Sequence, residues 1–425
     1  MFDQAAIVSL LQKEVNPAVG CTAPVAVGLA VTKCREILGE KVNIRSVRVI
    51  VSPGIFKNGY SVGIPNSGEK GNVFGAALGA VYGDSSLGLA VFSGVSPNDI
   101  EKARRFLQSH DVSVVCDPCK RGVYIEGIIF SDLGECHTIM NTHSNIVCVT
   151  LDGKSVYEQS ETSADAPTYT LEGLNIESIV SFAETVPFEE IHFLLDGISV
   201  NMALAQDGLA HDYCLNIGKK LKTTFGEKYD LLPELKARVL VSAAADARMG
   251  GSSLPAMSTV GSGNQGITAI LPVAVLAKNI GVDDEKTARA LAITHLVTYY
   301  VKQYIGRISS MCLCGVAASA GAGCAITWLR GGSIQAMKGC IKNILAALTG
   351  MICDGAKGTC ALKMGVATAE AFHASDLAIM LSSAGSDDGI IDDDLDVTLD
   401  NVGKITQVTR DAIDDSIVEI INAKE

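Results

Sequence analysis

The chain has few aromatic residues and an excess of negative charge. Phenylalanine, tyrosine and tryptophan make up 5% of its 425 residues, with a single tryptophan. Lysine and arginine number 34 against 47 aspartate and glutamate, which gives a net charge of −13. Nucleic-acid-binding proteins concentrate basic side chains, interleaved with aromatic ones. No such stripe occurs here, so nucleic acid is not expected as a partner.

The first residues lack the features of a secretory signal. The opening sequence MFDQ has no basic region and no cleavable apolar stretch after it. The 13 cysteines are an odd number in a long chain, whereas disulfide scaffolds are small secreted domains. We therefore expect a reduced, cytoplasmic protein whose cysteines serve another purpose.

Two long stretches contain no charged side chain. They span residues 249–277 and 308–329, and the second is long enough to cross a bilayer. A membrane transporter for small amino acids is therefore one alternative. Both stretches are rich in Gly, Ser and Ala, and the first contains Pro255, Pro272 and an Asn-Gln pair. This composition favours a buried helix and a glycine-rich binding loop.

The pattern of apolar residues predicts an α+β fold. Residues 42–155 are expected to form an α/β lobe, inserted into a mainly helical, Gly/Ala-rich domain made of residues 1–41 and 156–425. Residues 156–170 are expected to be a connector, and the acidic stretch 387–400 a solvated loop before a terminal helix. The predicted strands span residues 42–51, 112–116, 122–130, 136–140 and 146–151.

Thiols near the C-terminal end carry most of the chemical information. Cys353 and Cys360 flank a tight turn that leads into a helix, and Cys312 and Cys314 lie about forty residues earlier. Iron–sulfur clusters are held by cysteine thiolates that need not be sequential. A [4Fe–4S] cluster used in catalysis should leave one iron open. The expected ligands are therefore Cys353, Cys360 and either Cys312 or Cys314.

The other cysteines divide into one catalytic candidate and a group of structural ones. Cys21 precedes a predicted helix with Thr22 as N-cap, where the helix dipole lowers the pKa of a thiol. Cys116 and Cys119 have zinc-ligand or redox spacing, but no second pair supports that hypothesis. We interpret five further cysteines as core residues: Cys34, Cys148, Cys214, Cys324 and Cys340.

Polar loops predict a binding pocket for the carboxylate of an amino acid. Residues 258–266 gather glycines and hydrogen-bond donors before a helix, and a helix N-terminus favours an anion. These glycine-rich segments match neither the phosphate-binding loop of nucleotide hydrolases nor the dinucleotide-binding fingerprint. The candidate binding residues are Ser262, Asn264 and Gln265 in this loop, with Lys57, Asn58, His143 and Asn145 from the predicted α/β lobe.

These segments, in the same order along nearly the whole chain, closely resemble the L-cysteine desulfidase family, which is related to the iron–sulfur L-serine dehydratases. The resemblance implies an oxygen-sensitive [4Fe–4S] cluster, no pyridoxal phosphate, and the splitting of L-cysteine into pyruvate, ammonia and sulfide. It also implies that Cys21 is the catalytic base. The matching segments are residues 16–24 (NPAVGCTAP), 57–59 (KNG), 143–145 (HSN), 261–266 (GSGNQG), 312–315 (CLCG) and 353–357 (CDGAK).

Two departures from the family pattern leave open the substrate and the resting fourth ligand of the cluster. Ala23 stands where the family usually has glutamate, and the chain ends without the cysteine that the related dehydratases use as a resting ligand. An L-serine dehydratase with the same cluster is therefore the main alternative, and a pyridoxal-phosphate lyase is another. The expected partner is a small amino acid. Neither nucleic acid nor a membrane is expected, and a homo-oligomer is compatible with the sequence.

Overall fold

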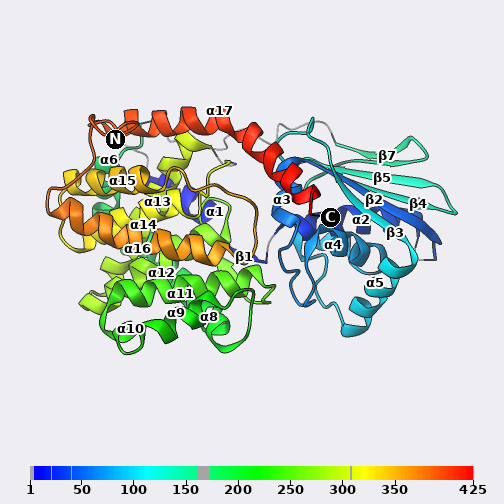
Figure 1. The fold of residues 1–425 in the computed structure, drawn as a ribbon, viewed down its shortest axis with the longest axis horizontal. Helices are drawn as coiled ribbons and strands as arrows, with labels where there is room; N and C mark the ends of the chain where they lie inside the picture. The colour runs from blue at the N-terminus through cyan, green and yellow to red at the C-terminus, as the bar shows by residue number, and fades with distance from the viewer. Residues whose placement is uncertain (1–3, 21, 40, 160–172, 307–308, 425) are drawn as a thin grey trace.

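The computed structural model describes residues 4–20, 22–39, 41–159, 173–306 and 309–424. Helices dominate, and one mixed sheet gathers the strands of residues 44–158, so the predicted α+β class is confirmed. Figure 1 shows the two parts side by side, with the helical part on the left and the sheet with its helices on the right. A short two-stranded pairing lies outside the main sheet and joins β1 (Pro17–Val19) to β8 (Pro255–Met257).

The main sheet has the strand order β3-β2-β4-β5-β6-β7. Only β2 and β3 run parallel, and the other neighbours are antiparallel. The five predicted strands are confirmed, but β7 occupies part of the predicted connector. Asp152 and Gly153 both have positive φ, as a tight hairpin turn requires, and so return the chain against β6. The strands are β2 (Ile44–Val51), β3 (Asp111–Cys116), β4 (Ile125–Ser131), β5 (Glu135–Met140), β6 (Ile146–Leu151) and β7 (Lys154–Glu158).

Helices between β2 and β3, together with α2 (Thr22–Leu38), pack beside the sheet. Two glycines let α4 approach α2 closely, because a Cβ on Gly75 or Gly79 would lie within 2.4 Å of an α2 carbonyl oxygen. Helix α2 therefore contributes to the core of the α/β lobe. The domain boundaries near residues 41 and 156 stay a prediction. The other elements here are α3 (Pro53–Gly59), α4 (Gly71–Val81), η1 (Ser85–Ala90) and α5 (Pro97–Ser109).

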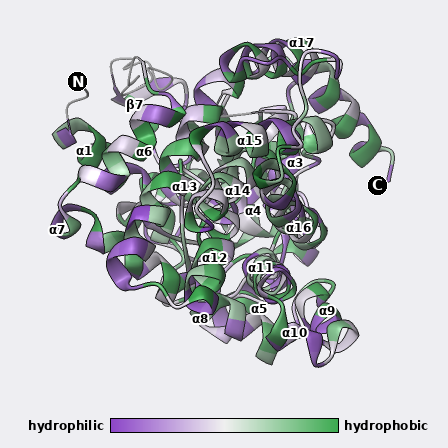
Figure 2. Ribbon diagram, turned by 90° about the vertical axis from the view of Figure 1, so that its left-hand side faces the viewer, coloured by the Kyte–Doolittle hydropathy of each residue, from purple (hydrophilic) through white to green (hydrophobic). Residues whose placement is uncertain are grey.

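The helical part is built around apolar helices that other helices surround. Figure 2 shows α12, α13 and α14 near its centre, and nearly every residue of α14 is buried. Small side chains in these helices allow close packing. The helices are α1 (Gln4–Glu14), α6 (Ile176–Thr185), α7 (Phe188–Ile191), η2 (His192–Leu195), α8 (Asp196–Ala210), α9 (Ile217–Phe225), α10 (Lys228–Leu231), α11 (Pro233–Met249), α12 (Gly263–Ile280), α13 (Asp284–Ile305), α14 (Val316–Leu329), α15 (Ile334–Leu348), α16 (Cys360–Ile379) and α17 (Leu395–Asn422).

The last helix connects the two parts. Helix α17 begins at Leu395, inside the acidic stretch predicted to be a loop, because the side chain of Asp394 accepts a hydrogen bond from the amide of Asp396 and caps the helix. It runs along the helical part and its C-terminal end reaches the α/β lobe beside α3 (Figure 1). Val418 and Ile421 there join the core of the lobe. Helix α17 thus touches both parts of the molecule.

The uncharged stretches do not form membrane-spanning helices. No helix of the described residues has both the length and the apolar character needed to cross a membrane. Helix α14 begins only at Val316, although the uncharged stretch that suggested a buried helix begins at residue 308. The residues before it pair with another segment instead, through an isolated bridge between Met311 and Ile352.

Candidate active site

The bridge between Met311 and Ile352 brings two of the predicted ligand segments together. The amide of Cys312 donates to the carbonyl of Met351 at 2.7 Å, and the amide of Cys353 donates to the carbonyl of Ser310 at 2.7 Å. Residues about forty positions apart therefore lie on adjacent extended segments. Cys360 begins α16, only a short turn after Cys353.

The thiols of Cys312, Cys353 and Cys360 lie near enough to interact electrostatically, with Cys312 buried and the other two residues half-buried. Burial and, second to it, the neighbouring Cys312 raise the pKa of Cys360 to about 12. Burial also raises the pKa of Cys353, and Cys312 again adds to the effect. The pKa of Cys312 is raised above all by its hydrogen bond with Cys314. Cys312 thus interacts electrostatically with both other thiols, whereas Cys314 lies next to Ser262, with 3.8 Å between Sγ and Oγ.

The donor set fits an iron–sulfur cluster. The surroundings of the three thiols disfavour a negative charge that has no positive charge nearby. Lys57 and Lys363 supply positive charge, and both lower the pKa of Cys353. Such cations offset the negative charge that thiolate ligands bring. Among the described residues, no three His, Cys, Asp or Glu side chains are placed to hold a single metal ion. The thiolates of a cluster bind different irons and so need not converge on one point.

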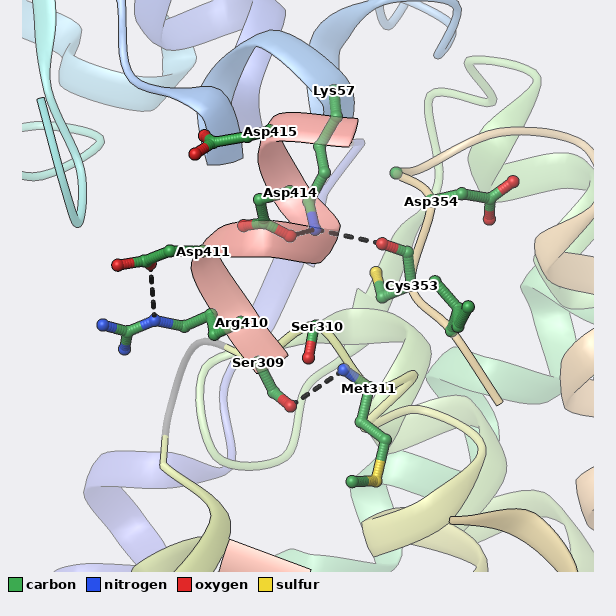
Figure 3. A network of polar contacts seen from close by, with 12 residues as sticks. Lys57, Ser309, Ser310, Met311, Cys353, Asp354, Arg410, Asp411, Asp414 and Asp415 are labelled. Carbon is green, nitrogen blue, oxygen red and sulfur yellow. Dashed lines mark hydrogen bonds and ion pairs between the residues drawn. The ribbon is translucent and has the colours of Figure 1, made fainter. Parts of the chain in front are cut away.

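Lys57 joins the loop between Cys353 and Cys360, called here the cysteine loop, to the last helix, α17. Its Nζ donates to the carbonyl oxygen of Cys353 at 3.0 Å and pairs with Asp414 of α17 at 2.5 Å (Figure 3). Both side chains of the ion pair are almost fully buried. Gly355 lies against the same turn, with φ of +100° and with its missing Cβ 2.1 Å from the carbonyl oxygen of Lys57. The described contacts of Lys57 are thus structural, and its role in binding a carboxylate stays a prediction.

Asn58, His143 and Asn145 lie at the same end of the α/β lobe. Asn58 follows Lys57 in α3, which begins just after β2 ends. His143 and Asn145 form the turn after β5, and strand register places the ends of these strands together.

Strands β2 and β5 end at the same edge of the sheet, because Val51 pairs with Ile125 of β4 and Ile125 pairs with Met140. Burial lowers the pKa of His143, which favours a neutral ring. Among the described residues, no hydrogen bond joins this turn to the cysteine segments; Asn145 instead donates to Asn141 at 2.8 Å.

The predicted binding loop precedes α12 and contains a strained residue. Val260 has a φ of +45°, which is unusual for a β-branched side chain and marks a conformation held by its surroundings. The buried Lys302 stabilises this loop conformation, because its Nζ donates to the Val260 carbonyl at 2.9 Å and to Gln265 Oε1 at 3.2 Å. Ser262 is the N-cap residue, but its side chain makes no capping hydrogen bond.

Two buried cations next to this loop escaped the sequence analysis, namely Lys302 and Arg248. Arg248 is 7% exposed and is the residue before the last of α11, directly before the 249–277 stretch. Its guanidinium donates to Asn264 Oδ1 at 3.0 Å and to the carbonyl of Gly20 at 2.6 Å. A signal was present, since Arg248 is the last charge before a long uncharged segment.

Cys21 lies outside the described residues, but both of its neighbours are described. Gly20 accepts the hydrogen bond from Arg248, and Thr22 is the first residue of α2. Gly20 has a φ of +62°, and a Cβ there would lie 2.4 Å from Pro65. Gly20, directly before Cys21, is thereby fixed against the α/β lobe and against Arg248.

Three neighbouring thiols and a polar loop thus lie where the two lobes meet, a set of groups that suits an iron–sulfur lyase. Comparison with known proteins agrees. The family model described as serine dehydratase alpha chain matches residues 141–419. The chain therefore belongs to the serine dehydratase alpha chain family, a family of iron–sulfur serine dehydratase-like lyases.

Full-length relatives extend the similarity to the whole chain. A UPF0597 protein of Caldanaerobacter subterraneus subsp. tengcongensis is 38% identical over 100% of this chain and 99% of its own. A UPF0597 protein of Alkaliphilus oremlandii is 37% identical over 99% of this chain and 98% of its own. Another, from Clostridium tetani, is 35% identical over 99% of both chains. Membership of a lyase family gives no support to the transporter hypothesis.

Proposed function

We propose that this protein is a [4Fe–4S]-dependent lyase that splits L-cysteine into pyruvate, ammonia and sulfide. The observation that carries the proposal is the backbone pairing of residues 310–312 with residues 351–353, which brings the Cys312, Cys353 and Cys360 thiols near enough to interact electrostatically. These three are the proposed ligands, with Cys312 favoured over Cys314 because of its interaction with both other thiols. When bound, the cluster supplies an open iron that acts as a Lewis acid on the leaving group.

The residues of the chain would perform the remaining steps. The thiolate of Cys21 removes the α-proton of the substrate, and the bond between Cβ and sulfur breaks as sulfide leaves. The product, 2-aminoacrylate, tautomerises and is hydrolysed by one water molecule to pyruvate and ammonia. The loop with Ser262, Asn264 and Gln265 orients the substrate, and the lobe residues Asn58, His143 and Asn145 close the pocket from the other side.

L-serine is the second candidate substrate, because the matching family model is named for serine dehydratase. The same residues would act, with hydroxide as the leaving group. Anaerobically purified protein should be assayed with both amino acids for pyruvate, and with L-cysteine for sulfide. We expect a higher kcat/KM for L-cysteine. A higher value for L-serine would reassign the substrate, and no pyruvate from either would contradict the lyase proposal.

Cys21 should be needed for turnover but not for the cluster. We expect Cys21→Ala to lower kcat by about a hundredfold or more, which is typical for loss of a general base. Its iron and sulfide content and its visible spectrum should match those of the wild type. Cys34→Ala, in α2 and within the core of the lobe, is the matched control and should retain turnover. Loss of the cluster in Cys21→Ala would make this residue a ligand instead.

A further inference from the structure

Arg248 is a buried cation for which the structure describes no anion. Its side chain is 7% exposed, and no carboxylate of the described residues forms an ion pair with it. Its two hydrogen bonds go to neutral oxygens, those of Gly20 and Asn264. Its Nε is buried and has no hydrogen-bond partner. A buried charge without a counter-charge is costly, so such a group is expected to meet an anion in the working protein.

The unpaired Nε lies over the start of α12. A Cβ on Gly263, the first residue of that helix, would be 2.6 Å from this nitrogen. Any larger residue at this position would therefore displace the guanidinium. The N-cap Ser262 gives the first amides of α12 no side-chain hydrogen bond. These amides and the Arg248 guanidinium are therefore hydrogen-bond donors at the same end of the helix.

The same place lies next to segments that carry the proposed ligands and the proposed base. Ser262, one residue before Gly263, is 3.8 Å from the thiol of Cys314. On the other side, Arg248 holds the carbonyl of Gly20, directly before Cys21. The α/β lobe also meets the helical part here, because the amide of Gly63 donates to the carbonyl of Met249 at 2.9 Å.

We propose that Arg248 and the first amides of α12 bind the α-carboxylate of the amino-acid substrate. This inference rests on the proposed function and deepens it by naming the residue that selects an α-carboxylate. A guanidinium suits this task, because its planar fork binds both oxygens of a carboxylate. Lys57, the cation expected from the sequence, already pairs with Asp414.

The test compares ligands with and without a carboxylate on the cluster-loaded protein. L-alanine lacks a leaving group, and L-alaninamide replaces its carboxylate by a neutral amide. By calorimetry, the wild type should bind L-alanine on the order of a hundredfold more tightly than L-alaninamide, as for a buried charge pair. Arg248→Gln should remove this preference by weakening only the binding of L-alanine, and it should raise KM far more than it lowers kcat.

Further variants separate recognition from folding. Arg248→Lys should recover part of the preference, because it keeps the charge but loses the fork. Arg330→Gln is the matched control, since Arg330 already pairs with Asp376 at 2.6 Å, and it should keep the wild-type preference. Circular dichroism and iron content should show that each variant is folded and loaded.

The outcomes distinguish this proposal from the lyase proposal. Unchanged KM and unchanged ligand preference in a folded Arg248→Gln variant of an active enzyme would overturn the carboxylate site and leave the lyase function standing. Binding of L-alanine that depends on Arg248, without turnover of either amino acid, would support the site and overturn the lyase function. Tighter binding of inorganic phosphate than of L-alanine would also overturn the assignment to a carboxylate.

Discussion

Replacing Cys353 or Cys360 by alanine is expected to abolish both the brown absorption of the protein and its lyase activity. Each thiol would bind one iron directly, and no other described thiol interacts with this group except Cys314. Loss of a ligand therefore removes the cluster and does not merely slow the reaction. The measurements are the visible spectrum, the iron and sulfide content and the pyruvate assay, all under anaerobic conditions.

Variants at the first pair of cysteines test which thiol is the third ligand. Cys312→Ala should have the same effect as Cys353→Ala, whereas Cys314→Ala should retain iron. Cys340→Ala is the matched control, because Cys340 is fully buried in α15 away from these segments. A Cys353→Ala protein that keeps a full complement of iron and sulfide would contradict the ligand set.

The sequence predicted the strands of the α/β lobe well but missed short elements between glycines. Strands β2 to β6 alternate apolar with polar residues or are rich in β-branched residues, so each strand can be recognised from its own short sequence. Helix α3 has no such pattern: it holds seven residues that include two glycines, and its place is set by packing against α17 and the cysteine loop. Strand β1 is only three residues long and exists because β8, far along the chain, pairs with it.

Site residues with distinctive chemistry could be found from the sequence, whereas their supports could not. Thiols and glycine-rich loops stand out in a list of residues, and spacing suggested that Cys353 and Cys360 act together. The roles of Lys57 and Arg248 depend on partners hundreds of positions away, Asp414 and Gly20. No local pattern records such pairs, so only the folded chain shows which cation is neutralised.

The buried ion pair of Lys57 and Asp414 should be one of the largest single contributions to stability. Lys57→Met would leave the Asp414 carboxylate buried without its counter-charge, which typically costs about 3–5 kcal/mol. We expect the free energy of unfolding in urea to fall by an amount of that order. The double variant Lys57→Met/Asp414→Leu should recover most of the loss, because both charges are then absent.

The same pair of variants distinguishes the structural role of Lys57, as a clamp between α3 and α17, from a role in substrate binding. If Lys57 acts only as a clamp between α3, the carbonyl of Cys353 and α17, KM should recover together with stability in the double variant. If Lys57 also binds the substrate carboxylate, KM should stay raised after stability has recovered. Lys236→Met is the matched control, because Lys236 and Asp230 form an exposed pair at 3.2 Å. Its loss should cost less than about 1 kcal/mol, since water already screens both charges. Equal losses in the buried and the exposed variants would show that burial does not determine the strength of the clamp.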